Sequence, residues 1–176
     1  MVIREAGEAE LRDVLGVQRL AFGREDEAGL VAELIGDPTA RPMLSLVAER
    51  EGRLVGHVLF TAVELVGAGE PVECSILAPL AVLPEVQGTG VGRGLIEAGC
   101  RILAARGGSL VFVLGDPDYY GRFGFEAAIP VGLEAPHPIE PEAAWRVRAL
   151  GPGVVGQVRG KVRPADALAG EELWRE

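Results

Sequence analysis

The spacing of hydrophobic residues divides the first third of the chain into helices followed by strands. Apolar residues recur at helical spacing over residues 8–21 and again over residues 30–35, which predicts two helices on either side of a charged break at residues 23–27. Strand-forming residues then predict a hairpin, because a Glu51-Gly52 turn joins two such runs. The predicted strands of this part cover residues 2–5, 44–48 and 53–65.

The middle of the chain alternates between strand and helix patterns. An apolar run over residues 72–82 predicts a central strand, and a glycine-rich turn follows at residues 87–92. The next segment is an amphipathic helix that ends at Gly107, and its apolar face carries Val91, Leu95, Ala98 and Ile102. Residues 109–114 are continuously apolar, as in a strand buried on both faces. Strand, crossover helix and strand predict a right-handed parallel unit, whose ligands gather at the carboxyl ends of the strands.

Pro79 interrupts the predicted central strand. Proline has no N–H group to donate to a neighbouring strand, so it occurs at sheet edges and at bulges. The chain must therefore bulge at Pro79 or leave one side of the strand unpaired there. The residues alone leave open which of these two arrangements is present.

A short helix is predicted directly after the strand that ends at residue 114. Asp116 can cap it, Pro117 suits its first position, and Asp118 complements the helix dipole. Beyond Phe125, prolines mark a loop region. The remaining predicted elements are strands over residues 145–150 and 154–162 and a helical turn on the surface within residues 164–176.

Composition restricts the function classes. The 176 residues predict a single domain over residues 1–176, with a core of about residues 1–150 and a C-terminal strand and tail extension. A net charge of −9 with no basic patch argues against a nucleic-acid partner. No apolar run approaches membrane-spanning length and no signal-peptide pattern is seen, so we expect a cytoplasmic protein without a membrane partner. Cys74 and Cys100 lack metal-ligand or disulfide spacing, so we expect buried thiols and no metal.

The glycine-rich turn Gln87-Gly88-Thr89-Gly90-Val91-Gly92 has the spacing Q-x-x-G-x-G. Successive backbone N–H groups in such a turn can point at one anion, and the partial charge of the following helix adds to the attraction. The spacing does not fit the dinucleotide pattern G-x-G-x-x-G, and the chain has no Gly-Lys-Ser or Gly-Lys-Thr of a phosphate-loop NTPase. An NAD- or ATP-binding enzyme is therefore disfavoured, whereas a pyrophosphate site and a plain strand-to-helix turn remain as alternatives.

The run from Leu80 to Gly92 resembles the acetyl-coenzyme A loop of the GCN5-related N-acetyltransferase (GNAT) family. The segment from Val111 to Phe125 is similar, more specifically, to the YhbS-like branch of that family. The resemblance implies an α/β (α+β) fold in which a mixed central sheet is flanked by helices and a parallel strand pair splays around acyl-coenzyme A. It also implies that the pantetheine is bound by Leu80, Ala81 and Val82, and the pyrophosphate by Gln87, Gly88, Thr89, Gly90, Val91, Gly92 and Arg93.

In the resembled family a tyrosine ahead of a Phe-Gly-Phe segment commonly serves as general acid, and Tyr120 matches it, with Tyr119 one residue away. A phenol with a pKa of about 10 stays protonated at neutral pH and can donate a proton to the leaving thiolate. By analogy with the family, the oxyanion would be met by the N–H of Val82. The alternative is a tyrosine that only packs against Phe123 and Phe125.

The general base is harder to find in the sequence. Some members of the family use a glutamate on the central strand, where this chain has Ile76, and Glu73, Ser75 or a chain of water molecules are the substitutes. His57 is expected to be structural, and His137, between prolines, is expected to be exposed. The family implies transfer from acetyl-coenzyme A to a primary amine, either a small molecule or a peptide. Many relatives pair as homodimers, and a non-catalytic acyl-coenzyme A-binding module is the alternative function.

Overall fold

The computed structural model describes residues 1–175 and contains one mixed β-sheet with helices on both of its faces. The main path of the sheet follows the order β1-β2-β3-β4-β5-β8-β6, and β9 and β7 extend it from the far end of β3. The strands are β1 (Val2–Glu5), β2 (Met43–Arg50), β3 (Arg53–Val66), β4 (Cys74–Val82), β5 (Leu110–Leu114), β6 (Glu126–Ala127), β7 (Leu133–Glu134), β8 (Trp145–Ala149) and β9 (Gly160–Arg163). The α-helices are α1 (Leu11–Phe22), α2 (Asp26–Ile35), α3 (Val91–Ala105) and α4 (Pro117–Gly121).

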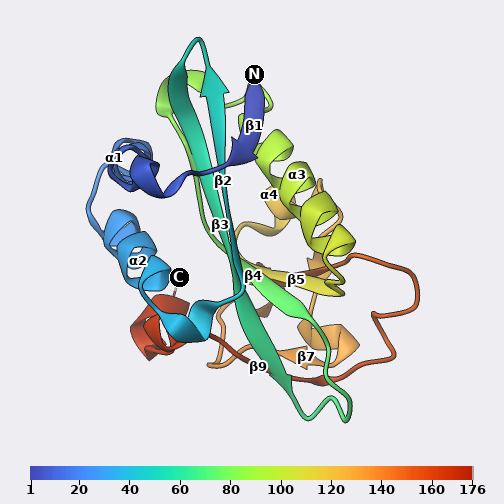
Figure 1. Cartoon of the computed structure of the whole chain (residues 1–176). Coiled ribbons are helices and arrows are strands. Elements are labelled where there is room, and N and C mark those ends of the chain that lie inside the picture. Colours follow the sequence, from blue (N-terminus) through green and yellow to red (C-terminus); the bar gives the residue numbers. More distant parts are fainter. Residues whose placement is uncertain (176) are drawn as a thin grey trace.

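The two faces of the sheet are covered by different helices (Figure 1). α1, α2 and the C-terminal tail lie on one side, and α3 lies on the other. The core on the first side contains Val31 and Leu34 of α2, and the core on the second contains Leu95 and Ile96 of α3. These apolar stripes recur at helical spacing, so burial against the sheet, rather than helix propensity, accounts for most of the stability of the helices.

β4 contains the bulge that Pro79 predicts. In its antiparallel pairing with β3, Val58 lies opposite Leu80 and Phe60 lies opposite Leu77, so Ala78 and Pro79 together face Leu59. One extra residue on β4 is therefore accommodated at the proline, which could not have donated a ladder hydrogen bond. The prediction of a bulge at this position is confirmed.

β4 and β5 are parallel neighbours that separate part of the way along their length. Their pairing covers Cys74–Ile76 with Leu110–Phe112, after which β4 continues to Val82 without this neighbour. The separation begins just before the bulge. Along the rest of β4, the backbone groups on the β5 side are left available to a ligand.

The C-terminal part differs from the prediction in two respects. The strand predicted over residues 154–162 is shorter and later, at Gly160–Arg163, where it pairs with β3 and β7. The tail forms two short 3-10 turns, Asp166–Leu168 and Glu171–Trp174, but it is not confined to the surface. Trp174 is buried, packs edge-on against Trp145 at 5.4 Å between ring centroids, and donates a hydrogen bond to the Leu168 carbonyl. The expectation of a purely surface tail was therefore wrong.

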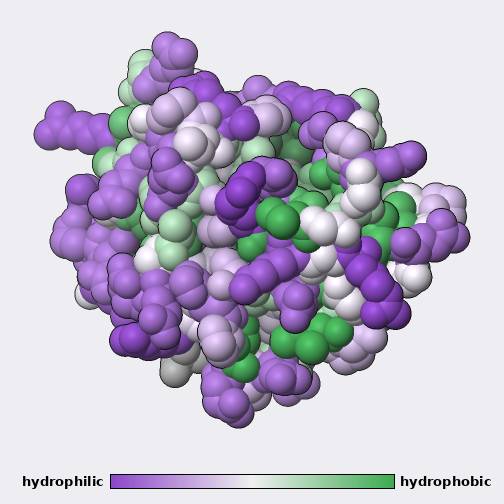
Figure 2. Space-filling view, turned by 90° about the horizontal axis from the view of Figure 1, so that it is seen from below, coloured by the Kyte–Doolittle hydropathy of each residue, from purple (hydrophilic) through white to green (hydrophobic). Residues whose placement is uncertain are grey.

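The face of the molecule that is seen from below is mostly hydrophilic (Figure 2). Figure 2 shows the face at the lower end of Figure 1, where hydrophobic residues form small, separate patches among charged and polar ones. No helix within residues 1–175 is long and apolar enough to cross a membrane.

Candidate functional site

The glycine-rich turn leads directly into α3, as the sequence predicts. Gly88 and Gly90 have φ values of +76° and +94°, and Gly90 is the N-cap residue of α3. Side chains with a Cβ atom rarely adopt this left-handed conformation, which explains the glycines at these two positions. Within residues 1–175, the backbone N–H groups of residues 88–93 donate no hydrogen bond. These groups, together with the dipole of α3, are free to bind an anion at the helix N-terminus.

Side-chain hydrogen bonds hold this turn against the sheet. The Gln87 Nε2 group donates to the carbonyl of Val82 at 3.2 Å and so connects the turn to the end of β4. Thr89 Oγ1 donates to the Val86 carbonyl at 2.5 Å and accepts from Arg50 Nη1 at 3.0 Å. Arg50 comes from the end of β2 and was missed by the sequence analysis. No local pattern marks it, because its partner is 39 positions further along the chain.

Positive charge and aromatic rings surround the first turn of α3. The guanidinium of Arg93 lies 5.9 Å from the ring centroid of Phe123, and that of Arg122 lies 5.6 Å from the ring centroid of Tyr119. The Tyr119 hydroxyl lies so close to Gly92 that a Cβ atom there would overlap it. The end of the turn is therefore held by packing as well as by backbone conformation. The guanidinium groups of Arg93 and Arg122 add positive charge that attracts an anion.

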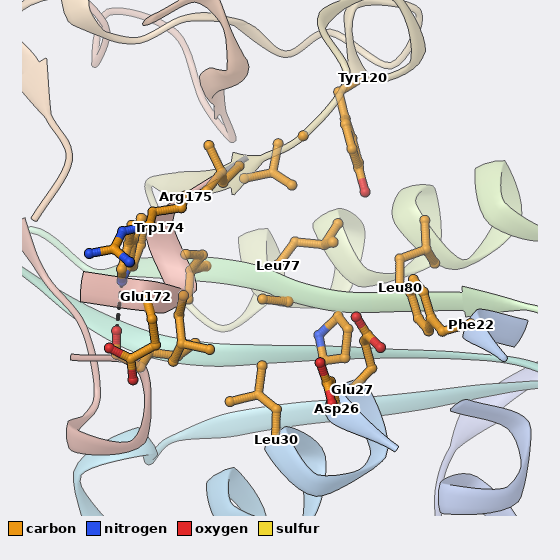
Figure 3. A pocket seen from close by; sticks show the side chains of 18 of the residues that line it. Phe22, Asp26, Glu27, Leu30, Leu77, Leu80, Tyr120, Glu172, Trp174 and Arg175 are labelled. Carbon is orange, nitrogen blue, oxygen red and sulfur yellow. Dashed lines mark hydrogen bonds between the residues drawn. The ribbon is translucent and has the colours of Figure 1, made fainter. Parts of the chain in front are cut away.

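A cavity of about 540 Å³ opens beside the separated part of β4. Its floor includes the bulge and the residues around it, from Ile76 to Leu80, and its other walls come from β5, α1, α2, α4 and the tail. Figure 3 shows Tyr120 on one side of the cavity and Asp26 and Glu27 on the opposite side. Of the three residues predicted to bind pantetheine, Leu80 lines the cavity, whereas Ala81 and Val82 do not.

Tyr120 is placed in this cavity by a short, well-capped helix. Asp116 Oδ1 accepts a hydrogen bond from the Asp118 N–H at 2.9 Å, and Pro117 occupies the first helical position, as predicted. The Tyr120 ring packs against the backbone of Gly115, where a Cβ atom would overlap it, and edge-on against Phe125 at 5.7 Å. Within residues 1–175 its hydroxyl makes no hydrogen bond. Tyr119, by contrast, does not line the cavity.

Burial keeps the Tyr120 phenol protonated. Burial raises the pKa of Tyr120 well above its ordinary value, and the neighbouring Tyr119 raises this pKa further. The ionised form is disfavoured because a phenolate in this setting would lose its hydration. The hydroxyl is therefore a proton donor throughout the neutral range, and it faces a cavity large enough for a ligand.

Two carboxylates of the cavity, Asp26 and Glu27, come from the segment predicted only as a charged break and the start of the helix after it, and a third, Glu172, comes from the tail. Glu27, in the first turn of α2, lines the cavity and binds Arg24 through both carboxylate oxygens, at 2.8 and 2.5 Å. The hydrogen bond from Arg24 lowers the pKa of Glu27. The side chain of β4 that lines the cavity at the expected place of a base is Ile76, whereas Glu73 and Ser75 line a different cavity with Leu103.

The histidines and cysteines have structural surroundings. His57 is fully buried, with its ring nitrogens 2.8 Å from Gln18 Nε2 and 2.8 Å from Ser45 Oγ, and burial lowers its pKa to about 4. His137 contacts the Ala169 carbonyl at 2.8 Å. Cys74 and Cys100 are buried free thiols, and burial raises their pKa values to about 12 and about 11. No group of metal-binding side chains was found in the described part of the chain.

These features fit a long thioester ligand that carries phosphates. The unbonded amides of residues 88–93 are free to bind an anion, and the separated edge of β4 leads from them toward the cavity where Tyr120 lies. Glycine-rich turn, free strand edge and proton donor therefore follow one another along β4, in the order that coenzyme A would require.

Comparison with known proteins agrees with this geometry. A family model described as an acetyltransferase (GNAT) domain matches residues 2–128. The uncharacterized N-acetyltransferase YjhQ of Escherichia coli K12 is 47% identical over 145 residues, which cover 81% of this chain and 80% of YjhQ. The crystal structure of the Escherichia coli N-acetyltransferase YhbS in complex with CoA has a TM-score of 0.87 at 31% identity, covering 97% of this chain and 92% of that one.

A GNAT family acetyltransferase from Brucella melitensis, solved in complex with acetyl-CoA, has a TM-score of 0.75 at 30% identity, covering 95% of this chain and 97% of that one. The expected fold, with its parallel β4–β5 pair between flanking helices, is confirmed, as is the resemblance to the YhbS-like branch. The chain therefore belongs to the GNAT acetyltransferase family and is an acetyl-coenzyme A-dependent N-acetyltransferase.

Proposed function

We propose that the protein transfers an acetyl group from acetyl-coenzyme A to a primary amine by direct attack, with Tyr120 as general acid. The observation that carries this proposal is the Tyr120 hydroxyl, which is unbonded, held protonated by burial, and placed in the cavity beside the separated part of β4. Bound acetyl-coenzyme A would supply a thioester carbonyl that an amine can attack. In this proposal the chain contributes binding, orientation and a hydrogen bond to the leaving sulfur.

The binding residues follow from the two parts of the site. The amides of residues 88–93 and the side chain of Arg93 would hold the pyrophosphate. The free edge of β4 from Leu80 to Val82 would hold the pantetheine, with the N–H of Val82 directed at the thioester oxygen. Gln87 and Arg50 would fix the turn relative to that edge through the Val82 carbonyl and Thr89.

Tyr120 would share its proton with the sulfur through a hydrogen bond as the carbon–sulfur bond breaks. The acceptor ammonium would first release one proton to water, and the departing thiolate would take the second proton from the attacking nitrogen. Burial raises the pKa of the Tyr120 phenol above that of a thiol, so complete proton transfer to the sulfur would be uphill. The phenol would therefore act through a hydrogen bond to the negative charge that develops on the sulfur. The rings of Phe125 and the backbone of Gly115 hold the phenol in place without consuming its hydroxyl.

The test is Tyr120→Phe, which keeps the ring and removes the proton. We expect kcat to fall by about a hundredfold or more, the usual contribution of a general acid, while the Kd for acetyl-coenzyme A changes little. Tyr119→Phe is the matched comparison, because its hydroxyl lies against Gly92 at the glycine-rich turn and not in the cavity. Any loss in this variant should appear in the Kd for acetyl-coenzyme A, while its kcat stays near that of the unaltered protein. Equal losses of kcat in the two variants would refute the assignment of Tyr120.

The sequence also leaves open an acyl-coenzyme A-binding module without turnover, which the family assignment disfavours and an assay can exclude. Ile76, at the place where some relatives carry a glutamate, favours such a module, because within residues 1–175 β4 contributes no carboxylate to the cavity. Release of free thiol from acetyl-coenzyme A in a broad panel of amines distinguishes the two functions. Saturable binding without release with any amine would support the binding module.

A further inference from the structure

The cavity beside Tyr120 has an apolar wall built from three separate elements. Phe22 ends α1, Leu30 lies on α2, and Leu173 and Trp174 belong to the tail. Phe22 and Leu173 are 40% and 41% exposed, and they are among the few large hydrophobic side chains that the described chain leaves exposed. A ligand with an apolar body would cover both of them, and it would be stabilised in proportion to the apolar area removed from water.

Charged side chains lie at one end of the same cavity, where Arg24 lines it together with Asp26 and Glu27. Figure 3 shows the carboxylates of Glu27 and Asp26 opposite Tyr120. The side chain of Glu27 is 15% exposed, whereas its partner Arg24 is 60% exposed, so the carboxylate is much less hydrated than the guanidinium. An ammonium group in the cavity would therefore meet a partly desolvated carboxylate, where ionic hydrogen bonds are stronger than at an open surface.

The environment of Glu27 decides whether this carboxylate acts as a general base or as a counter-charge for the acceptor. The hydrogen bond from Arg24 holds the pKa of Glu27 below its usual range. Such a carboxylate is a poor acceptor for the proton of an alkylammonium, whose pKa is about 10, but it remains a counter-charge at every pH near neutrality. Its role is thus to bind and orient the acceptor, and not to deprotonate it.

We infer that the acceptor of this enzyme is a primary ammonium with an apolar body, which Glu27 orients by its charge while Phe22 and the tail residues Leu173 and Trp174 bind the body. The inference rests on the proposed function, because it takes this cavity as the acceptor site, and it adds the class of amine. A polyhydroxylated amino sugar fits less well, because hydroxyl groups placed against Phe22, Leu30 and Leu173 would lose water without gaining partners there.

The tail contributes part of the apolar wall that would select the acceptor. The matched family model ends at residue 128, whereas the tail residues that line the cavity lie between Leu168 and Arg175. Trp174 is fixed by its contact with Trp145 and its hydrogen bond to the Leu168 carbonyl, so the wall is a packed part of the structure. The apolar wall is therefore built partly by a segment outside the matched region.

The first experiment compares Glu27→Gln with Glu25→Gln in steady-state acetylation of phenethylamine by the full chain. Glu25 is the matched control, because it lies in the same charged break, pairs with Arg19, and does not line the cavity. We expect Glu27→Gln to raise KM for phenethylamine about tenfold, the loss of one charged hydrogen bond, with Glu25→Gln unchanged. Arg24→Gln should lower KM, because it removes the cation that competes for the Glu27 carboxylate. An unchanged KM in both Glu27→Gln and Arg24→Gln would overturn the inference.

The second experiment measures binding without turnover, by calorimetry with phenethylamine, phenethyl alcohol and glucosamine. We expect the unaltered protein to prefer phenethylamine to the alcohol, and Glu27→Gln to lose that preference. A preference of the unaltered protein for glucosamine would overturn the inference, as would an equal loss of affinity for the amine and the alcohol in Glu27→Gln. Either result would leave acetyl transfer to other amines unaffected. If no amine were acetylated but acetyl-coenzyme A still bound, the proposed function would fail, and the binding preferences would still decide this inference.

Discussion

The side-chain amide of Gln87 donates a hydrogen bond to the carbonyl of Val82 at 3.2 Å, and it thereby connects the glycine-rich turn to the last residue of β4. Replacing Gln87 with Ala should weaken acetyl-coenzyme A binding about three- to tenfold, the usual net value of one hydrogen bond, with little effect on stability. Isothermal titration measures this change. The control is Gln157→Ala, which replaces an exposed glutamine outside the site. An equal affinity for acetyl-coenzyme A in both variants would show that the hydrogen bond between Gln87 and Val82 does not contribute to binding.

Gly92 and Tyr119 form a second coupled pair. A Cβ atom at Gly92 would overlap the Tyr119 hydroxyl, so Gly92→Ala should destabilise the protein by about 1–3 kcal/mol and displace the first turn of α3. Tyr119→Phe removes the atom that is in the way. The double variant should therefore regain most of the loss, in both urea unfolding and coenzyme affinity. Additive losses in the double variant would mean that the glycine is needed for another reason.

The conformation of the glycine-rich turn, the bulge in β4 and the cap of α4 can be predicted from the sequence, because each depends on local residues. The glycines at positions 88 and 90 have positive φ values, Pro79 produces a bulge, and Asp116 caps a helix, and each of these depends on a residue type and its nearest neighbours. The rest of the site depends on contacts between distant segments. Arg50 contacts Thr89 from another strand, and Trp174 reaches the cavity only because the tail returns to Trp145. Such contacts leave no spacing pattern in the chain.

The buried His57 predicts a pH-dependent stability. Burial lowers the pKa of His57 from 6.5 to about 4, so between these values the unfolded chain binds a proton that the folded chain does not. Stability is therefore complete above the unfolded pKa and falls as the pH drops through this window, by about 3 kcal/mol in total. Urea unfolding from about pH 7 to about pH 5 measures the slope.

The variant His57→Gln should show a flatter slope over that range, whatever its own stability, because it lacks the titrating group. His137→Gln is the control and should keep the original slope. The same slope in the unaltered protein and in His57→Gln would assign the effect to other groups. Carboxylates with lowered pKa values, such as Glu10, contribute only at lower pH.

The most direct test of the central claim, that the glycine-rich turn holds acetyl-coenzyme A, is a calorimetric titration of the unaltered protein and of Gly90→Val. The account predicts saturable binding of acetyl-coenzyme A but not of NAD or ATP. It also predicts that binding is lost in Gly90→Val, since valine is strained at a φ of +94°. Gly69→Val places the same residue at a φ of +84° in a loop away from the site, and it should bind normally. Unchanged binding in Gly90→Val, or no binding by the unaltered protein, would contradict the account.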